Sequence, residues 1–251
     1  MQENDREIHD LIIDNDSYMD VLMNDNRWEV LYNLSPLREN LLEWYPFDKS
    51  ASLLEVNAEF GALTSLYCRK VKHVVSLCSD ELQKNAIEHR CRDYSNLQVI
   101  RSISDINEKF DYIAIINPIQ NVEEIVDGVI QYLSDNGKII IACDNSLALR
   151  YFLNDTASEH SICVSKNHIT KYLSQRQFND IDFYYPSPDF RLPNAIYSEK
   201  YLPHDGDLRN VNPPFVGEKY QVINEDYVYD MVCDENIYEN MANSFLIIAS
   251  K

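Results

Sequence analysis

The stretch best suited to chemistry is the junction Leu54–Thr64 between an expected strand and an expected helix. It holds a carboxylate at Glu55, an amide at Asn57 and a glycine at Gly61. A glycine there permits a tight turn and lets the backbone approach a ligand closely, and Asn57 tolerates a left-handed backbone. Glu59, however, puts a side chain and a charge where a ligand needs open space. On local evidence alone, an ordinary strand-to-helix turn explains the junction better than a ligand-binding loop.

Other candidate residues also have a simple structural interpretation. Asp144 follows a buried apolar run and could act as a general base, but a helix-capping carboxylate explains it equally well. The tyrosines from Tyr184 to Tyr229 could stack on a sugar, although tyrosines in such a stretch more often pack against a sheet. The acidic segment His204–Asp207 lacks the number and spacing of oxygen ligands that calcium requires, so we interpret it as a surface turn.

Cysteine and histidine form no recognisable site in the sequence. The six cysteines include no CxxC pair, and the six histidines show no ligand spacing with them. Several cysteines lie in apolar runs, where a thiol behaves as a small hydrophobe. The sequence therefore predicts neither a disulfide framework nor a metal site, and it favours a reducing cytoplasm.

Composition limits the classes of partner. The chain has 251 residues, with 22 Lys and Arg against 41 Asp and Glu, which gives a net charge of −19. A surface of this sign repels phosphate groups, so nucleic acid and anionic membranes are poor candidates. The polar start Met1–Glu7 has no signal-peptide character, and no apolar run is long enough to span a bilayer.

The elements that must position these residues alternate along the chain. From Ala51, short runs rich in β-branched residues alternate with segments of helical spacing. Because the runs are mostly apolar throughout, they indicate strands buried on both faces of a parallel sheet. Repeated strand–helix–strand units predict right-handed crossovers and a doubly wound α/β sheet. The expected strands are Ser52–Val56, His73–Cys78, Leu97–Arg101, Phe110–Ile116 and Lys138–Cys143. The expected helices are Gly61–Lys70, Ser79–Arg92 with Ser79 as its N-cap, and Val122–Leu133.

The second half of the chain adds two expected strands. Asp135–Gly137 predicts a turn just before a strand. Further strands are expected at Asp182–Tyr185 and Ser244–Ala249. Between them, the stretch Pro186–Tyr220 is rich in proline and tyrosine, and we expect it to be an ordered loop over the sheet.

The sequence predicts helices in the N-terminal part of the chain. Within Met1–Phe47, Ser35 and Pro36 mark a cap and first turn ahead of a helix at Leu37–Trp44. We expect residues 1–50 to form a helical extension that packs on a core of residues 51–251, in a single globular unit.

Several segments of the chain resemble a group of class I S-adenosylmethionine-dependent methyltransferases, found among bacterial proteins linked to glycosyltransferases and surface-polysaccharide clusters. The resemblance extends from about Trp28 to Lys251, and it indicates the family but not the substrate. The segments that carry it are Leu34–Asn40, Trp44–Phe47, Leu54–Thr64, Phe110–Ile113, Asp144–Asn145, Phe183–Phe190, Ile196–Ser198, Tyr201–Pro203 and Asn243–Leu246.

The resemblance implies a Rossmann-like, doubly wound, seven-stranded mixed sheet of order 3-2-1-4-5-7-6, with the last strand antiparallel. It also implies N-terminal helices, a Pro/Tyr-rich insertion before the last strand, and S-adenosylmethionine as cofactor across the ends of strands one to four. The implied cofactor-binding residues are Arg38, Glu55, Asn57, Ala58, Gly61, Cys78, Ser102, Ile103 and Asn117. The implied substrate residues are Asp144, Asn145, Tyr184, Tyr185, Asp189 and Tyr197, with Asn117 and Asp144 as catalytic candidates.

Several cofactor-facing positions depart from the family pattern. Asn57 stands where glycine is usual, and Cys78 stands where an acidic residue usually binds the ribose hydroxyls. After strand four, Asn117–Gln120 replaces Gly-x-x-Glu, and after strand five, Asp144–Ala148 replaces Glu-Asn-Arg-Phe-Gly. The acceptor-side loop that normally follows is shortened to Asn154–Val164. These clustered departures predict weakened cofactor binding, or none.

Three hypotheses follow, and an active methyltransferase ranks first. It would methylate an oxygen or nitrogen of a polar cell-surface glycan or a related small-molecule precursor, a reaction that depends mainly on positioning and exclusion of water. The second hypothesis is a catalytically degenerate protein of the same fold that supports a methyltransferase paralogue or a glycosyltransferase. The third, a dinucleotide-dependent oxidoreductase, is the weakest because the chain lacks G-x-G-x-x-G.

Overall fold

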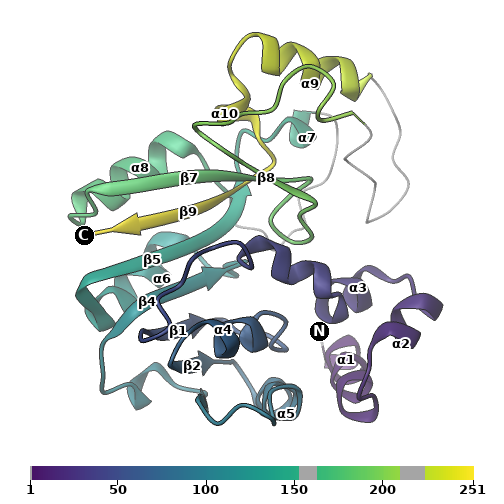
Figure 1. The fold of residues 1–251 in the computed structure, drawn as a ribbon, viewed down its shortest axis with the longest axis vertical. Helices are drawn as coiled ribbons and strands as arrows, with labels where there is room; N and C mark the ends of the chain where they lie inside the picture. The colour runs from purple at the N-terminus through teal and green to yellow at the C-terminus, as the bar shows by residue number, and fades with distance from the viewer. Residues whose placement is uncertain (1, 153–162, 210–223) are drawn as a thin grey trace. The chain divides into compact units, whose positions relative to one another are not determined.

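The computed structural model describes residues 2–152, 163–209 and 224–251, in which strands alternate with helices as expected (Figure 1). Its strands are β1 Ser52–Val56, β2 His73–Leu77, β3 Leu97–Ile100, β4 Phe110–Ile116, β5 Leu133–Asn145, β6 Cys163–Val164, β7 Asp180–Ser187, β8 Ala195–Ser198 and β9 Ser244–Ser250. Its α-helices are α1 Gln2–Asp14, α2 Met19–Asn24, α3 Trp28–Leu34, α4 Thr64–Lys70, α5 Glu81–Arg90, α6 Val122–Val129, α7 Leu149–Phe152, α8 Lys166–Gln175, α9 Glu225–Asp234 and α10 Tyr238–Met241. Short 3₁₀ helices are η1 Pro36–Leu41, η2 Ile103–Asp105 and η3 Ile130–Tyr132.

The strand order is β3-β2-β1-β4-β5-β9-β7-β8, with β6 beside β5. β1 pairs in parallel with β2 and β4, and β2 pairs in parallel with β3. β9 is antiparallel to β7, with Asp180 opposite Ser250. This order confirms the predicted 3-2-1-4-5-7-6 arrangement, since β9 and β7 are its last two members. The mixed, Rossmann-like α/β fold is therefore as expected.

The Pro- and Tyr-rich stretch is only partly a loop. β8 pairs antiparallel with β7, with Tyr197 opposite Tyr185, and so adds a strand beyond the seven expected. The β-branched and aromatic residues of this short segment suit the edge of a sheet, where only one side needs a partner. The rest of the predicted loop, from residue 210 to 220, lies outside the described residues, as does most of Asn154–Val164.

Three local predictions were wrong. The expected turn Asp135–Gly137 lies inside β5, where glycine is needed because a Cβ at Gly137 would come within 2.7 Å of the Leu133 side chain. The N-cap of α5 is Asp80, whose Oδ1 accepts the Gln83 backbone N–H at 2.9 Å, whereas the Ser79 hydroxyl donates to the Gln83 side chain. The helix expected at Leu37–Trp44 is instead the 3₁₀ helix Pro36–Leu41. Its cap is as predicted, because the Ser35 hydroxyl accepts the Leu37 N–H.

Contacts divide the chain into two compact units. Unit 1 comprises Met1–Ile116 and Val129–Lys138, and unit 2 comprises Asn117–Gly128 and Ile139–Lys251. Strands β1 to β4 belong to unit 1 and β6 to β9 to unit 2, while β5 contributes to both. The boundary expected at residue 50 between an extension and a core stays a prediction.

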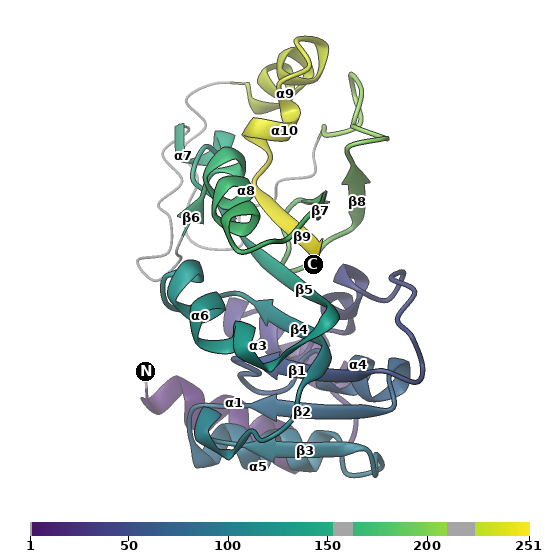
Figure 2. The same cartoon turned by 90° about the vertical axis from the view of Figure 1, so that its left-hand side faces the viewer.

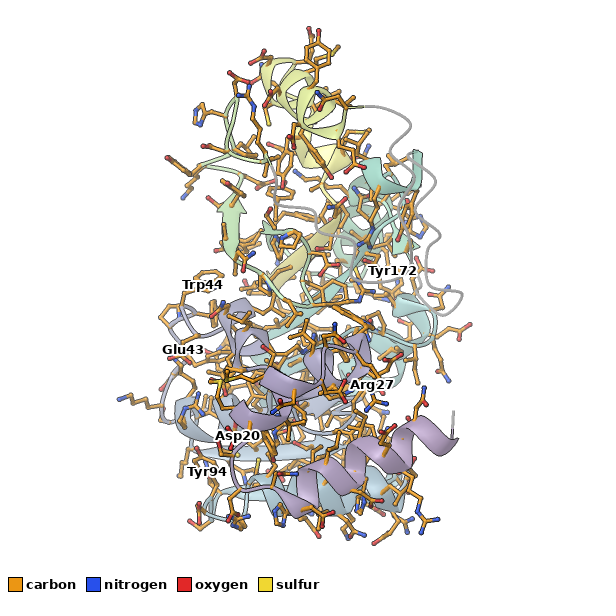
Figure 3. The ribbon with its side chains drawn as sticks, turned by 90° about the vertical axis from the view of Figure 1, so that its right-hand side faces the viewer. Asp20, Arg27, Glu43, Trp44, Tyr94 and Tyr172 are labelled. Atoms are coloured by element: carbon orange, nitrogen blue, oxygen red, sulfur yellow. The ribbon has the colours of Figure 1, made fainter. Side chains whose placement is uncertain are left out.

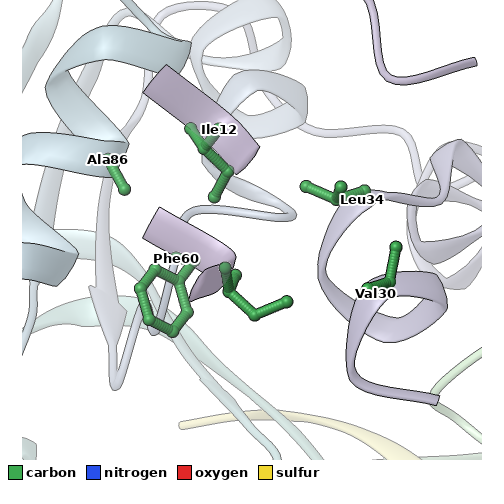
Figure 4. Close-up of a cluster of buried hydrophobic side chains, with 6 residues drawn as sticks. Ile12, Val30, Leu34, Phe60 and Ala86 are labelled. Atoms are coloured by element: carbon green, nitrogen blue, oxygen red, sulfur yellow. The ribbon is translucent and has the colours of Figure 1, made fainter. Parts of the chain in front are cut away.

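In unit 1, helix α1 packs against α5 and α3, α5 packs beside β3, and α4 beside β2 (Figure 2). The helices and the loop after β1 share an apolar cluster (Figure 4). Its buried members are Ile8, Ile12, Val30, Leu34, Phe60 and Ala86. Full burial of a side chain of this size contributes about 1.5–3 kcal/mol. The N-terminal helices are thus attached to the loop after β1 by core packing.

Ion pairs add less to this attachment. Arg27, which is labelled in Figure 3, precedes α3. It donates to both carboxylate oxygens of Glu7 in α1 at 2.8 Å and also pairs with Asp25. Arg27 and Glu7 are both about half exposed, so water and salt screen the pair and it adds little to stability. In the part of the chain that the structure describes, no helix combines the length and apolar character that crossing a bilayer requires.

Candidate functional site

The loop after β1 has an unusual backbone. Asn57, Glu59 and Gly61 all have left-handed φ angles, of 58°, 49° and 76°. For a non-glycine residue this conformation costs about 1–2 kcal/mol, although asparagine tolerates it. Such strain persists only where the surroundings enforce it, and it is concentrated at functional sites. The loop therefore keeps a shape suited to glycine even though two of the three residues are not glycine.

Contacts from distant parts of unit 1 hold this loop. Arg90 of α5 donates to the carbonyl of Phe60 at 3.0 Å and to the carbonyl of Asn33 at 2.9 Å. Within the loop, Gly61 N–H donates to the Ala58 carbonyl at 2.8 Å. Arg90 thus links the loop to the end of α3. No pattern in the sequence indicates this role, because arginine near a helix C-terminus is a common surface residue.

Gly61 is required by packing within the protein. A Cβ at this position would lie 3.0 Å from Ile87 Cγ1 of α5 and 3.3 Å from the Thr64 hydroxyl. The glycine therefore allows α5 to approach the loop closely. Any effect of a larger residue on ligand binding would be mixed with an effect on this packing.

We expect Gly61→Ala to lower the free energy of unfolding by about 1–3 kcal/mol, because both the φ angle and the contact with Ile87 oppose a side chain. Gly61→Val should be worse. Urea denaturation measures both variants. The matched control is Gly128→Ala in α6, where no atom lies within 4 Å of an added Cβ and alanine favours the helix. Equal stability of Gly61→Ala and wild type would contradict the packing argument.

Glu55, the carboxylate at the end of β1, is buried. Its Oε2 accepts hydrogen bonds from the hydroxyls of Ser76 at 2.6 Å and Thr64 at 2.7 Å. Burial raises the pKa of Glu55 to about 7, despite these hydrogen bonds and the charge of Arg38; the charge of Glu59 adds to the rise. Glu55 is therefore partly protonated near neutral pH.

A second polar cluster lies beside the loop. The Tyr32 hydroxyl of α3 donates to Glu59 Oε2 at 2.8 Å. The guanidinium carbon of Arg38 lies 4.0 Å from the centre of the Tyr32 ring, so the cation is stacked on its face. The Glu59 side chain is thus directed to α3. Tyr32 was not singled out in the sequence, because a tyrosine in an apolar helix resembles a core residue.

Cys78 does not present its side chain at the surface. It is 3% exposed and packs with Ala58 and Ile87, and its Sγ lies 3.5 Å from the Ile100 carbonyl oxygen. Burial raises the pKa of Cys78 to about 11, so the thiol stays neutral. The first carboxylate after β2 is Asp80, which is exposed at the N-terminus of α5.

The two residues expected near adenine lie at η2. Ser102 caps η2 through Ser104 N–H at 3.3 Å, and its hydroxyl is exposed. Ile103 is half-buried, and its carbonyl accepts the Tyr132 hydroxyl at 3.3 Å. Both therefore remain accessible to a ligand at the carboxyl end of β3.

In unit 2, Asp144 at the end of β5 belongs to a network of four charges. Arg191 donates to both carboxylate oxygens of Asp144, at 2.9 and 2.6 Å, and Arg150 pairs with Asp144 as well. Both arginines also contact Asp189. Burial alone would raise the pKa of Asp144, but the hydrogen bonds and charges of the two arginines lower it. A carboxylate held in this way is a poor proton acceptor. The two carboxylates and the two guanidiniums of the network balance in charge.

Asn145 and Asn117 have different environments. The Asn145 amide donates at 2.8 Å to the carbonyls of Asn240 and Ala242, which fixes the end of β5 to the chain before β9. Asn117 is half-buried, has a left-handed φ of 54°, and its N–H donates to the Ala142 carbonyl at 3.0 Å. Asn145 therefore has a structural role. Asn117 has a left-handed φ angle, as residues of the loop after β1 also have.

One of the predicted substrate tyrosines, Tyr185, contacts a lysine. Lys166, at the start of α8, donates to the Tyr185 hydroxyl at 2.9 Å, to Glu199 at 2.6 Å and to Glu239 at 2.5 Å. Tyr185 is fully buried, while Tyr184 and Tyr197 are half-buried. Tyr185 is therefore a core residue.

We expect Lys166→Met to lower the free energy of unfolding by about 1–3 kcal/mol, because it leaves two carboxylates and a buried hydroxyl without their shared donor. Urea denaturation measures the loss. Lys171→Met in the same helix is the control, since Lys171 is exposed. A similar, small effect of both substitutions would show that the Lys166 contacts add nothing to stability.

A cavity of about 420 Å³ lies in unit 2. Its walls come from the segment after β8 and from the ends of α9 and α10, and include Glu199, Tyr201, Asp205, Asp234 and Tyr238. The volume falls in the range of small-molecule sites, about 300–1,000 Å³. Among the described residues, no three His, Cys, Asp or Glu side chains are grouped as metal ligands.

No protein-family model and no curated protein matches the chain. Solved structures do match. A S-adenosylmethionine-dependent methyltransferase from Thermotoga maritima, described as a possible histamine N-methyltransferase, is 12% identical and has a TM-score of 0.54, covering 93% of this chain and 96% of that one. One from Archaeoglobus fulgidus is 14% identical with a TM-score of 0.54, covering 86% and 93%. The chain has the class I methyltransferase fold.

Phosphoethanolamine N-methyltransferase 1 of Haemonchus contortus is also similar, at 10% identity and a TM-score of 0.53. The match covers 99% of this chain and 48% of that protein, so the chain spans about half its length. At these identities, the similarity concerns the class I methyltransferase fold alone.

Within the class I methyltransferase fold, the predicted site residues fall into two groups. Unit 1 contains most of the predicted cofactor residues, namely Arg38, Glu55, Asn57, Ala58, Gly61, Cys78, Ser102 and Ile103. Unit 2 contains Asn117 and the predicted substrate residues Asp144, Asn145, Tyr184, Tyr185, Asp189 and Tyr197. Arg150 and Arg191, which pair with Asp144, were missed because neither lies in a recognisable motif.

Proposed function

We propose that the protein is a S-adenosylmethionine-dependent methyltransferase that acts on a polar cell-surface glycan or a related small-molecule precursor. The observation that carries this proposal is the left-handed backbone at Asn57, Glu59 and Gly61, at the carboxyl end of β1. Ligands of doubly wound sheets bind at the carboxyl ends of strands, and a strained loop at that position is typical of a binding site. Because the chain has the class I methyltransferase fold, S-adenosylmethionine is the ligand that we expect at this loop.

The residues of unit 1 fit such a cofactor. Arg38 supplies a cation for a carboxylate, and the loop after β1 supplies backbone groups. Asp80, exposed after β2, supplies a carboxylate for the ribose hydroxyls, a role that the buried Cys78 thiol does not suit. Ser102 and Ile103 offer polar and apolar contacts to adenine. When bound, the cofactor supplies an electrophilic methyl group.

Unit 2, taken by itself, contains polar groups suited to an acceptor. Asn117 has a half-buried amide on a strained backbone and is suited to hold an acceptor hydroxyl or amine. Asp144 keeps Arg150 and Arg191 in place and is assigned no proton transfer, because both its oxygens are ion-paired. Methyl transfer depends mainly on alignment of donor and acceptor, so a strong base is not required.

Isothermal titration calorimetry with S-adenosylmethionine and S-adenosylhomocysteine tests the proposal. We expect binding in the high-micromolar range, since Asn57 places a side chain in the loop after β1 where glycine is usual. Asp80→Ala should weaken it about tenfold or more, the value of one charge-assisted hydrogen bond. Asp80→Asn, which keeps the helix cap, separates loss of charge from loss of the cap.

No binding of either compound at millimolar concentration would overturn the proposal. That result would favour the alternative, a catalytically degenerate protein of this fold that supports an active methyltransferase or a glycosyltransferase. The substitution Cys78→Glu is unsuitable as a gain-of-binding test, because it would bury a carboxylate among Ala58 and Ile87.

A further inference from the structure

The cavity of unit 2 is formed by residues that the proposed function does not use. Its volume is about 420 Å³, and its wall consists of residues 199–205 together with Cys233, Asp234, Asn236 and Tyr238. All of these residues belong to unit 2, so the cavity is complete within one compact unit. None of them is among the residues predicted to bind the cofactor or the substrate.

The wall combines an apolar part with an acidic part. Pro203 is buried and Leu202 is half-buried, whereas the three carboxylates of the wall are exposed to solvent. These carboxylates are Glu199, Asp205 and Asp234. A ligand that matches this distribution has an apolar body and carries a polar group where it meets the acidic part.

The negative charge of the wall exceeds the positive charge beside it. Glu199 and Asp205 each share a single cation with a second carboxylate, so neither is fully neutralised. The shared cations are Lys166, with Glu239 as the second carboxylate, and Arg209, with Asp230. Asp234 forms no ion pair among the described residues. Because the wall itself contributes one lysine, Lys200, and no arginine, a surplus of negative charge remains.

This surplus acts on a group inside the wall. Burial and the nearby charges of Asp230, Asp207 and Asp234 together raise the pKa of the Cys233 thiol to about 11. Cys233 lines the cavity, so the same charges act on a ligand there. A hollow surrounded by charges of one sign concentrates ions of the opposite sign. The cavity therefore favours a cation over an anion.

A buried hydroxyl in the wall points independently to a polar ligand. Tyr238 is 3% exposed, and its ring packs edge-on against the rings of Tyr185 and Tyr197. Among the described residues, no group forms a hydrogen bond with its hydroxyl. Burial raises the pKa of Tyr238 well above its usual value, so the hydroxyl stays neutral and can accept as well as donate. A ligand in the cavity would supply the partner that the protein does not.

An organic ammonium ion matches these features together. An ammonium group carries one positive charge and N–H donors, so it can donate to a carboxylate and to a neutral hydroxyl at once. Its bond to a carboxylate is charge-assisted and therefore stronger than a neutral hydrogen bond. An apolar body attached to it gains by leaving water for the apolar part of the wall. A volume of this size is ordinary for a small-molecule site.

We infer that the cavity of unit 2 is a binding site for a small organic ammonium ion with an apolar body. Asp234 and the Tyr238 hydroxyl accept hydrogen bonds from the ammonium, while Leu202 and Pro203 contact the body. The inference assigns binding to this cavity and no methyl transfer. It does not rest on the proposed function, because unit 2 forms the cavity without any residue assigned to the cofactor.

Calorimetry of the full-length protein, without S-adenosylmethionine, tests the inference with three probes that share a phenylethyl body. They are 2-phenylethylamine, which is a cation near neutral pH, 2-phenylethanol, which is neutral, and 3-phenylpropionate, which is an anion. Salt at about 0.15 M screens long-range attraction by the net charge of the protein. We expect the amine to bind about tenfold or more tightly than the alcohol, as one charge-assisted hydrogen bond would require. The carboxylate should bind more weakly than the alcohol.

Two substitutions in the wall should reduce the affinity for the amine. Asp234→Asn should reduce it about tenfold and leave the affinity for the alcohol unchanged, as loss of one charge-assisted bond predicts. Tyr238→Phe should reduce it by a smaller factor without lowering stability in urea, because the hydroxyl has no partner within the described protein. The matched control is Glu235→Gln, which removes an exposed charge next to Asp234 but outside the wall. It should leave the affinity unchanged.

The results decide the inference independently of the proposed function. A preference for the amine that both wall substitutions reduce, and that Glu235→Gln leaves intact, supports it. No binding of the amine at millimolar concentration would overturn it, as would equal affinities for the three probes. An equal reduction by Asp234→Asn and Glu235→Gln would also overturn it, because net charge alone would then explain the attraction. Failure of S-adenosylmethionine to bind leaves each of these outcomes unchanged.

Discussion

Asp144→Asn is expected to lower the free energy of unfolding by about 3–5 kcal/mol. Asp144 is 2% exposed and is the shared partner of Arg150 and Arg191. The substitution keeps the size of the side chain but leaves two guanidiniums opposite one carboxylate, Asp189, and the side chains of the two arginines are only 17% and 13% exposed. Removal of one member of a buried ion pair has an effect of this size, because the remaining charge stays desolvated. Urea denaturation of the protein without ligand measures it.

The double variant with Arg191→Met sharpens this test. If the cost of Asp144→Asn arises from unpaired arginines, the double variant should lose less stability than the sum of the two single variants. Asp182→Asn in β7 is the control, since Asp182 is exposed and a surface substitution changes stability by about 0.5 kcal/mol or less. Additive losses in the double variant would show that the network is not coupled.

Glu55→Gln is expected to change how stability depends on pH. Because the pKa of Glu55 is raised from 4.5 to about 7 on folding, its carboxyl favours the folded state at low pH. This contribution is fully present below about pH 4.5 and is lost as the pH rises through about 7. The shift corresponds to about 3 kcal/mol between these limits. Glu55→Gln has no such titration, so the stability of wild type minus that of the variant should fall by about this amount between pH 4.5 and 8.5.

The comparison with Glu55→Gln removes the other source of pH dependence, the net charge of −19, which both proteins share apart from the substituted group. Glu43→Gln is a matched control, because Glu43 is about half exposed. A stability difference between wild type and Glu55→Gln that is constant from pH 4.5 to 8.5 would show that Glu55 ionises with an ordinary pKa in the folded protein.

The sequence by itself determined the main strands of the sheet. The bounds of β1 and β4 agree with the predicted ones to the residue, because uninterrupted apolar runs flanked by polar residues are a local property of the chain. The order of the strands followed from the resemblance together with right-handed crossovers. The failure at Asp135–Gly137 has a physical reason as well. Turn-forming residues favour a turn only weakly, and the pairing of a long strand outweighs this preference. β5 therefore continues through Asp135–Gly137.

Only the tertiary structure decided what the side chains at the site do. Glu59 looked like an obstruction, but Tyr32, 27 positions earlier, directs its carboxylate. Cys78 looked like a lost ribose ligand, but its thiol packs under the loop, while the exposed carboxylate is Asp80. Asp144 looked like a candidate base until Arg191, 47 positions later, was found beside it. The charge state, pKa and orientation of a side chain depend on partners that are distant in the chain. The periodicity of apolar residues depends on neighbours in the chain, so a single sequence shows periodicity directly but not these partners.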